Sequence, residues 1–502
     1  MAAPTGSAAF NIMGETLHRL VGMGIGNKDE SLSEAKKKML QSRFSNLLCL
    51  IIDERSLLSA NDLGKAEKRI KATIHSGLGY HNKMFGGLPV LLLVGDDYQL
   101  PAHDGIIQVM NKQSLKNNEA NGFKILMKCG EKVMNLQTSR RIADSQEDQK
   151  TLLQKIRFGA MDLTADEVKK LQSLRLENIE REHGNQAVQC IKKDAVFLSY
   201  TNTKKDARNL SMLRTIATPA NPVAIIRPRS TGKRAGKAYA RHFSGKQKNT
   251  SSFLCIGAKV ALDAVNYVPA WGLYNEACGT VDEIIFARES NPNDGHMPLY
   301  VVVDFPSYSG PIWDNQNPTH VPVPNNKIFC NSNCCSREFC PLVLAWGITV
   351  HRFEGQSAGP VDPGKIPNAY KCVVFDPHDY TAEKLALGLF YTGVSRATTL
   401  GDDTGLNSAL FFEGKEATAR RMQFLGRKVN STDYYASFIK RQKWVDYLQT
   451  NSFAGDMTEA EISHLLAWIE TASFEPGHVQ RAAIKKQMHR QMNTFNTTAG
   501  GS

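Results

Sequence analysis

Four short apolar runs, each ending at an aspartate, a glycine or an asparagine, dominate the hydropathy pattern of the chain. They are LLCLIID (47–53), LPVLLLVGD (88–96), AVFLSYTN (195–202) and AYKCVVFD (369–376), and helical stretches separate them. Continuous apolar strands that alternate with helices are typical of parallel sheets covered on both faces. The runs are too short and too sharply ended to favour buried helices. The pattern therefore predicts an α/β fold built on parallel sheets.

The pattern changes between about residues 206 and 340. A basic stretch at 225–248 precedes two β-like segments, CIGAKVALDAVNY and LYVVVDFPSY, with Gly, Pro and Asn between them. Such segments predict a small β-rich insertion within the second α/β domain. We therefore divide the chain into a first domain at 1–140, a second domain at 141–205 and 341–440, an insertion at 206–340, and a basic helical tail at 441–502.

The amino-acid composition indicates the class of binding partner and the cellular compartment. The 502 residues carry 61 Lys and Arg against 49 Asp and Glu, a formal net charge of +12. Because Lys and Arg gain affinity for phosphate chains by releasing counterions, this charge favours a polyanionic partner. Ten sparse, unevenly spaced cysteines favour free thiols in a reducing compartment. With neither a secretory signal nor an apolar run of about 18 residues, we expect an intracellular protein without a membrane partner.

Polar residues follow two of the predicted strands. Asp53 and Glu54 end the first run, and Gln99 comes shortly after the second. In nucleotide hydrolysis the first acid can hold Mg²⁺ through its water shell and the second can polarise the attacking water. A glutamine past a strand end can sense a γ-phosphate by hydrogen bonding. An acidic pair that only caps the following helix is an equally good reading of Asp53 and Glu54 alone.

Two further patterns each leave two readings open. The basic run from Arg227 to Lys248, with Tyr239 and Phe243, offers charge and stacking surfaces for nucleic acid, but a solvated loop is equally consistent. Four cysteines within 330–340 suggest zinc, yet they lack paired two-residue spacings, which favours a packing role. They are Cys330, Cys334, Cys335 and Cys340.

From residue 2 to about 405 the chain resembles the superfamily 1 DNA helicases, specifically the Pif-type and Helitron-associated branch close to RecD. The segments that carry the resemblance are PTGSAA and GETLH near the start, FGG followed by GDDYQLPA, NLQTSRRIADSQEDQKTLLQKIRFG, LAWGITVHRFEGQSAG, and YTGVSRA. The resemblance implies two RecA-like P-loop NTPase-type domains. It also implies an SH3-like module in the insertion, on the match of Asn266 and of the Gly272–Asn275 segment.

The resemblance also assigns roles to single residues. It implies ATP and Mg²⁺ as cofactors. Catalytic roles fall on Asp53, Glu54, Gln99, Arg141 and Arg396, with Arg140 as the alternative to Arg141. Asp53, Gln99, Gly355 and Arg396 would contact the nucleotide, and Asp53 would hold Mg²⁺ through water. Single-strand contacts fall on Thr5, His18, Asn266 and His351.

The function implied is that of an ATP-dependent DNA helicase moving 5′-to-3′ along single-stranded DNA, in repair, recombination or transposition. Its partners would be single-stranded DNA and DNA junctions, and the motifs leave RNA open as a substrate. We expect a monomer, and nuclear placement follows only from the resemblance.

One expected motif is absent from the printed sequence. No Gly-x-x-x-x-Gly-Lys-Ser/Thr occurs in the 502 residues, and Gly232–Ala238 has the wrong spacing. A P-loop supplies backbone N–H groups, a lysine and a Mg²⁺-binding hydroxyl. We therefore expect a chain that starts after the phosphate cradle, has an incomplete first domain with uncovered apolar sheet edges, and hydrolyses ATP feebly or not at all. The alternative function is a non-catalytic remnant that binds single-stranded nucleic acid.

A second departure lies at Glu354. The family usually has His-Lys-x-Gln-Gly where this chain has HRFEG, so a glutamate replaces an amide close to the expected phosphates. The added negative charge is unfavourable unless Arg352 or Mg²⁺ compensates it.

Overall fold

A computed structural model describes part of the chain. It covers 1–453 without 24–31, 74–82, 103–104, 106–108, 110–113, 137–140, 143–145, 158–162, 233–250, 264, 289, 291–295, 330–334, 362–367, 379–381, 384–385, 402–405, 416 and 418–431. The chain divides into two compact units, and the two parallel sheets, the antiparallel sheets of residues 224–344 and the sites below lie in the first, Met1–Val133 with Gln137–Ser452. The second unit is Met134–Leu136 with Phe453–Ser502.

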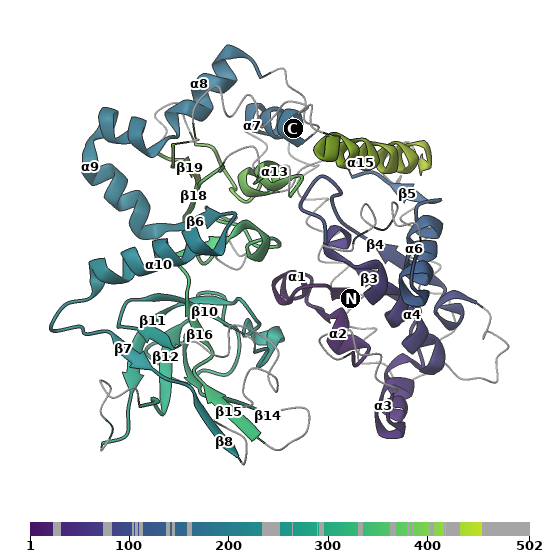
Figure 1. Ribbon diagram of the computed structural model, residues 1–502, viewed down its shortest axis with the longest axis horizontal. Coiled ribbons are helices and arrows are strands. Elements are labelled where there is room, and N and C mark those ends of the chain that lie inside the picture. Colours follow the sequence, from purple (N-terminus) through teal and green to yellow (C-terminus); the bar gives the residue numbers. More distant parts are fainter. Residues whose placement is uncertain are drawn as a thin grey trace. The chain divides into compact units, whose positions relative to one another are not determined.

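The first parallel sheet has four described strands in the order β2-β1-β3-β4 (Figure 1). They are β1 (Ala2–Ala3), β2 (Glu15–Thr16), β3 (Cys49–Ile52) and β4 (Val90–Leu93). The helices of this region are α1 (Gly6–Asn11), α2 (Leu17–Leu20), α3 (Glu34–Phe44), α4 (Ala60–Thr73) and α6 (Asn117–Cys129). Helices α4 and α6 approach so closely that a Cβ on Gly122 would lie 1.8 Å from the Ala60 carbonyl oxygen. Only glycine fits there.

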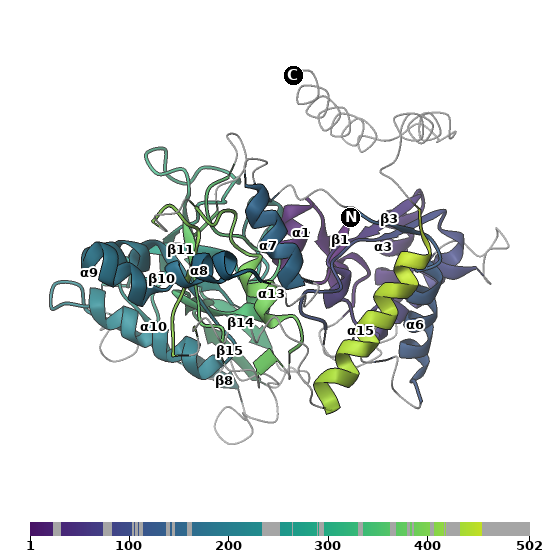
Figure 2. The same cartoon turned by 90° about the horizontal axis from the view of Figure 1, so that it is seen from above.

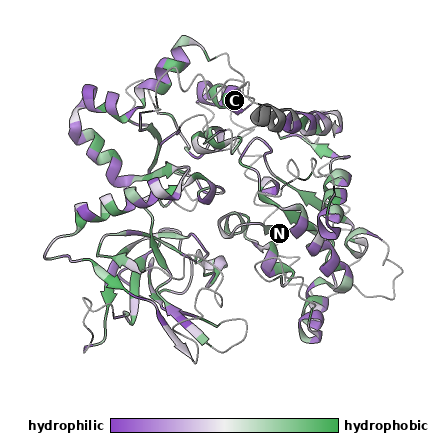
Figure 3. Ribbon diagram, in the orientation of Figure 1, coloured by the Kyte–Doolittle hydropathy of each residue, from purple (hydrophilic) through white to green (hydrophobic). Residues whose placement is uncertain are grey.

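Strand β4 is an edge of the described sheet. Its register pairs Ile52 of β3 with Leu93, and no other described strand pairs with it. The region is hydrophobic, as the colours of Figure 3 show. Nevertheless, the side chains of Leu92 and Val94 are 48% and 39% exposed. The predicted burial of this run on both faces is therefore wrong for β4, whereas the expected uncovered apolar edge is present.

Replacing Leu92 by lysine is expected to slow aggregation of the purified chain, because a charge on an open apolar edge blocks edge-to-edge pairing. The side chain is already half exposed, so the free energy of unfolding should change by less than about 0.5 kcal/mol. Light scattering on warming measures the first effect and urea unfolding the second. The half-buried Leu91→Lys provides the contrast, since it should destabilise, and unchanged scattering for Leu92→Lys would rule out the edge as the aggregation site.

The second parallel sheet contains the other two predicted strands. Its order is β17-β6-β18-β19, with β17 (Gly347–Thr349), β6 (Ala195–Ser199), β18 (Cys372–Phe375) and β19 (Leu410–Phe412). Separate apolar clusters cover its two faces. Its helices are α7 (Glu147–Arg157), α8 (Ala165–Ser173), α9 (Leu176–Asp194), α10 (Asn202–Ile216) and α13 (Leu389–Val394). All four apolar runs thus form parallel strands, which confirms the predicted α/β class.

Antiparallel strands fill most of the predicted insertion. A five-stranded sheet has the order β13-β12-β11-β10-β16, beside smaller sheets β14-β15-β8 and β7-β9. The strands are β7 (Ala224–Ile226), β8 (Arg229–Gly232), β9 (Ser252–Leu254), β10 (Lys259–Leu262), β11 (Cys278–Ile285), β12 (Tyr300–Asp304), β13 (His320–Pro324), β14 (Asn326–Phe329), β15 (Cys335–Phe339) and β16 (Leu342–Leu344). The β-rich texture is as predicted. The domain boundaries themselves remain a prediction, and α10 crosses the one placed at 205/206.

Helix α15 (Thr432–Thr450) contacts the C-terminal end of α6, and the two helices lie next to each other in Figure 2. The Tyr447 hydroxyl donates to the Met127 carbonyl oxygen at 3.3 Å. The remaining short elements are the turns η1 (Arg55–Leu57), η3 (Met84–Gly87), η5 (Pro269–Trp271) and η7 (Val350–Arg352), and the strands β5 (Val133–Met134) and β20 (Ser452–Phe453). The predicted tail beyond 453 and most of the basic run lie outside the described residues.

The cysteine and membrane predictions are tested only in part. Cys330 and Cys334 lie outside the described residues, whereas Cys335 and Cys340 are buried. Burial raises the pKa of the Cys340 thiol to about 12, which suits the packing role. Within the described ranges, no three His, Cys, Asp or Glu side chains are grouped to hold a metal ion. No helix in those ranges is long and apolar enough to cross a membrane.

Candidate functional site

Two acidic residues stand at the carboxyl end of β3. The Asp53 N–H donates to the Ala2 carbonyl oxygen at 2.9 Å, and the Glu54 N–H donates to Asp53 Oδ1 at 2.9 Å. Glu54 has a φ of +50°, a left-handed conformation that is strained for this residue type. Burial raises the pKa of both carboxyls. The strained turn fixes Glu54 instead of letting it cap a helix freely, which favours the catalytic reading.

The loop after β4 carries Gln99 and is held from a distant helix. The Gln99 N–H donates to the Asp96 carbonyl oxygen at 3.2 Å. Arg441 of α15 donates to the carbonyl oxygens of Tyr98 at 3.2 Å, Gln99 at 3.3 Å and Leu387 at 2.6 Å. Sequence reasoning missed Arg441, because nothing in a basic helical stretch indicates which carbonyl oxygens it will meet.

Arg396 joins the two sheets at this loop. Its Nη2 donates to Gln99 Oε1 at 3.1 Å, while Nε donates to the Thr392 carbonyl oxygen at 3.1 Å and Nη1 to that of Gln356 at 3.4 Å. The side chain is fully buried. Gln99, the predicted phosphate sensor, and Arg396, a predicted catalytic residue, are therefore in direct contact.

Arg141 lies close to Arg396. Its Nη1 donates to the Ser395 carbonyl oxygen at 2.8 Å. The neighbouring Arg396 charge, together with burial, lowers the pKa of Arg141 to about 10, and Glu54 acts in the opposite direction. Two guanidinium groups that repel each other, one of them fully buried, are an arrangement suited to an anion between them. The alternative candidate, Arg140, lies outside the described residues.

Asp96 is a second link between the sheets that sequence reasoning did not assign. Its carboxylate accepts from Arg157 Nη2 at 3.1 Å and from the Tyr391 hydroxyl at 2.8 Å. Burial opposes ionisation, but Arg157 and these hydrogen bonds lower the pKa of Asp96 overall. The adjacent Asp97 pairs with Arg55. The Gly-Asp-Asp run was the available signal for this network.

Glu354 is the least compensated group near this site. It is 1% exposed, and neither carboxylate oxygen has a hydrogen-bond partner among the described residues. Burial raises its pKa well above the usual range, although Arg396 opposes the shift. Compensation by Arg352 is ruled out, because that side chain pairs with Glu276 at 2.8 Å and Asp263 at 3.2 Å.

Gly355 holds the next backbone position against α1. Its φ is +83°, and a Cβ there would lie 3.3 Å from Ser7 Oγ. Asn11 Nδ2 donates to the Gly355 carbonyl oxygen at 2.6 Å. These contacts join the first and second sheets on the α1 side, so Gly355 has a structural role whether or not it contacts a nucleotide.

The four predicted single-strand contacts lie in different places. Thr5 caps α1 by accepting from the Ala8 N–H at 3.3 Å, and His18 Nε2 lies 3.9 Å from Asp62 Oδ2. Asn266 Oδ1 accepts from the Asn275 N–H at 2.7 Å, so it braces its own turn. His351 is exposed just after β17. Their role in nucleic-acid binding stays a prediction.

The predicted catalytic residues are of the types that could bind the terminal phosphate of a nucleoside triphosphate. Arg141, Arg396 and Gln99 offer donors for a terminal phosphate, and Asp53 with Glu54 offers oxygens for hydrated Mg²⁺ and an attacking water. The printed sequence contains no P-loop for the remaining phosphates.

Parts of the chain are similar to known proteins. Residues 1–167 match the PIF1-like helicase family. The ATP-dependent DNA helicase PIF1 of Xenopus laevis is 28% identical over 364 residues, 72% of this chain and 49% of that protein. Three other relatives match over shorter segments, and the matched part is only 12% to 15% of the length of each relative.

Solved structures share the fold. The Pif1 helicase from Candida albicans has a TM-score of 0.57 at 19% identity, over 89% of this chain and 88% of that one. The Bacteroides Pif1 helicase in complex with ADP-AlF3 and ssDNA has a TM-score of 0.51 at 18% identity, over 94% and 87%. Residues 1–167 are thus similar to the PIF1-like helicase family, and the chain shares its fold with these Pif1 helicases.

Proposed function

We propose that the chain is the motor region of an ATP-dependent DNA helicase that moves 5′-to-3′ along single-stranded DNA and separates duplexes in repair, recombination or transposition. In this proposal the two parallel sheets are RecA-like domains and the antiparallel sheet is an SH3-like module. The observation that carries it is the hydrogen bond between Gln99 and Arg396. The names of the relatives and the nucleotide complex of Bacteroides Pif1 support it. Nuclear placement rests on the same resemblance.

The proposed chemistry divides among few side chains. Asp53 holds Mg²⁺ through its water shell, and Glu54 orients the attacking water. Arg141 and Arg396 stabilise the negative charge that develops on the terminal phosphate. Gln99 donates a hydrogen bond to that phosphate, and its contact with Arg396 changes as a result. The contact between the two sheets therefore depends on whether a nucleoside triphosphate is bound. Thr5, His18, Asn266 and His351 hold the single strand in this scheme.

A second candidate is a non-catalytic remnant that binds single-stranded nucleic acid. The absence of a Gly-x-x-x-x-Gly-Lys-Ser/Thr motif from the 502 residues favours it. Neither Asp53 nor Gln99 can replace the lysine charge and the backbone N–H cradle of a P-loop. The net charge of +12 would still support salt-sensitive binding.

Phosphate release from radiolabelled ATP, with and without single-stranded DNA, separates the two candidates. The remnant predicts release at the same background rate as Glu54→Gln with salt-sensitive binding of the strand retained, whereas the motor predicts DNA-stimulated release above that rate. Glu34→Gln, on the exposed side of α3, is the matched control. DNA-stimulated release that disappears in Glu54→Gln would mean that the site hydrolyses ATP without a P-loop, and would reject the remnant.

A further inference from the structure

Three ring side chains follow three neighbouring strands of the second sheet. Strand β6 pairs with β17 on one side and β18 on the other, with Ser199 opposite Thr349 and Leu198 opposite Phe375. Tyr200 follows β6, His351 follows β17 and His378 follows β18. Parallel strands end at one edge of their sheet, so the topology collects the three rings there.

The rings are in contact. The centroids of Tyr200 and His351 are 5.7 Å apart with the planes tilted by 41°, and those of Tyr200 and His378 are 6.0 Å apart in an edge-on arrangement. His351 is exposed and Tyr200 half-buried. Partial covering of its ring lowers the pKa of His351, which favours a neutral imidazole. A neutral ring beside a tyrosine suits stacking better than a phosphate contact.

His378 fixes the backbone of Tyr200. Its Nε2 accepts from the Tyr200 N–H at 2.9 Å, and its own N–H donates to Asp376 Oδ1 at 3.0 Å. The residue is buried and has a φ of +55°. Histidine at a positive φ is uncommon, and strain of this kind collects at functional sites.

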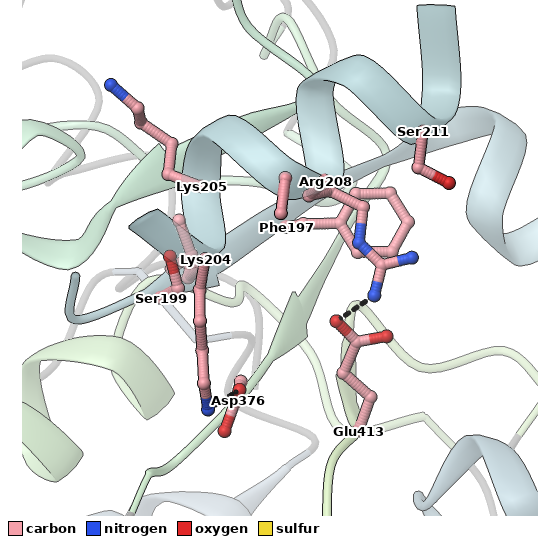
Figure 4. A pocket seen from close by; sticks show the side chains of 10 residues that line it. Phe197, Ser199, Lys204, Lys205, Arg208, Ser211, Asp376 and Glu413 are labelled. Carbon is pink, nitrogen blue, oxygen red and sulfur yellow. Dashed lines mark hydrogen bonds and ion pairs between the residues drawn. The ribbon is translucent and has the colours of Figure 1, made fainter. Parts of the chain in front are cut away.

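A positive charge lies beside the rings. Lys204 Nζ lies 2.6 Å from Asp376 Oδ2, and Figure 4 shows the two side chains pointing toward each other. Lys204, Lys205 and Arg208 line a pocket of about 290 Å³ at this edge. Lys204 and Arg208 each pair with a carboxylate, but the Lys204 side chain is 51% exposed and that of Arg208 27%. Lys204 is therefore the better placed of the two to approach a backbone phosphate.

We propose that Tyr200 and His351 form a base-stacking platform for single-stranded DNA, with Lys204 near the strand's phosphates and His378 as the positioning residue. The proposal rests on the proposed function, since it names where the strand lies on the second sheet. Stacking accepts any base, because every base has a π face. The platform therefore supplies affinity without sequence preference.

Fluorescence anisotropy of a labelled oligo-dT strand with the full chain tests the platform. Tyr200→Ala should weaken binding about tenfold, as is typical for loss of one stacked base, whereas Tyr200→Phe keeps the ring and should bind like the native chain. Tyr300→Ala removes an exposed tyrosine of β12 and is the matched control. Native affinity in Tyr200→Ala would overturn the platform.

A strand of the same length with abasic sites separates stacking from phosphate contacts. The native chain should prefer oligo-dT to the abasic strand, and Tyr200→Ala should bind both alike. Equal binding of both strands by the native chain overturns the platform but leaves DNA binding intact. Binding of neither strand overturns the proposed function as well.

The positioning role of His378 is tested by the fluorescence of a base in the bound strand, which reports on stacking and not on the stability of the protein. With 2-aminopurine in the strand, His378→Ala should reduce the quenching of its fluorescence on binding. His378→Asn should restore it, because an amide oxygen can accept the Tyr200 N–H and asparagine tolerates a positive φ. Full quenching in His378→Ala would remove the positioning role.

Discussion

Replacing Arg396 by alanine is expected to lower the free energy of unfolding by about 3–5 kcal/mol, the usual cost of removing one partner from a buried charged network. The guanidinium is fully buried and donates to Gln99, Thr392 and Gln356. Its loss takes one hydrogen-bond donor from each of these acceptors, and it also removes the charge that opposes protonation of Glu54 and Glu354. Urea unfolding followed by circular dichroism measures the change.

Two comparisons make this prediction specific. Arg181→Ala, on the exposed surface of α9 with a side chain that is 70% exposed, should change stability by less than about 0.5 kcal/mol. A double-mutant cycle of Gln99→Ala with Arg396→Ala should give a coupling energy of at least about 0.5 kcal/mol, as expected for residues in contact. Additive losses would contradict a direct link between the two sheets through Gln99 and Arg396.

The strands were predictable because their signal is local. Each apolar run, from LLCLIID to AYKCVVFD, contains a strand of a parallel sheet. The exposure of β4 was not visible in the same pattern. An apolar run reads alike whether or not a strand lies beside it, so Leu92 could be assigned to a strand but not to an open edge.

The site was predictable only as far as its motifs reached. Glu54, Gln99 and Arg396 were found from strand ends and family resemblance, and the structure brings them together. The two partners of Arg352 could not be predicted, because Glu276 and Asp263 lie in the insertion, far away in sequence. Likewise Arg441 comes from a helix with no motif of its own. Long-range pairing of charges depends on tertiary packing, which local sequence does not encode.

Replacing Glu354 by glutamine is expected to raise the free energy of unfolding by about 1–2 kcal/mol at about pH 8, the scale of an unsatisfied buried polar group. The carboxyl is buried, and both of its oxygens lack partners among the described residues. Burial raises its pKa well above the usual value, Arg396 opposes this, and Glu54 adds to it. Glutamine keeps the shape and removes the charge.

The pH dependence identifies the cause. A carboxyl whose pKa is raised by folding contributes stability below its unfolded pKa, and that contribution is lost as the pH rises through the folded pKa. The gain from Glu354→Gln should therefore be near zero at about pH 4 and grow toward about pH 8. Urea unfolding at both pH values measures it, with the exposed Glu180→Gln as control. A gain that is equal at both pH values would assign the effect to packing, and a loss of stability at about pH 8 would mean that Arg396 stabilises the Glu354 carboxylate by more than burial costs it.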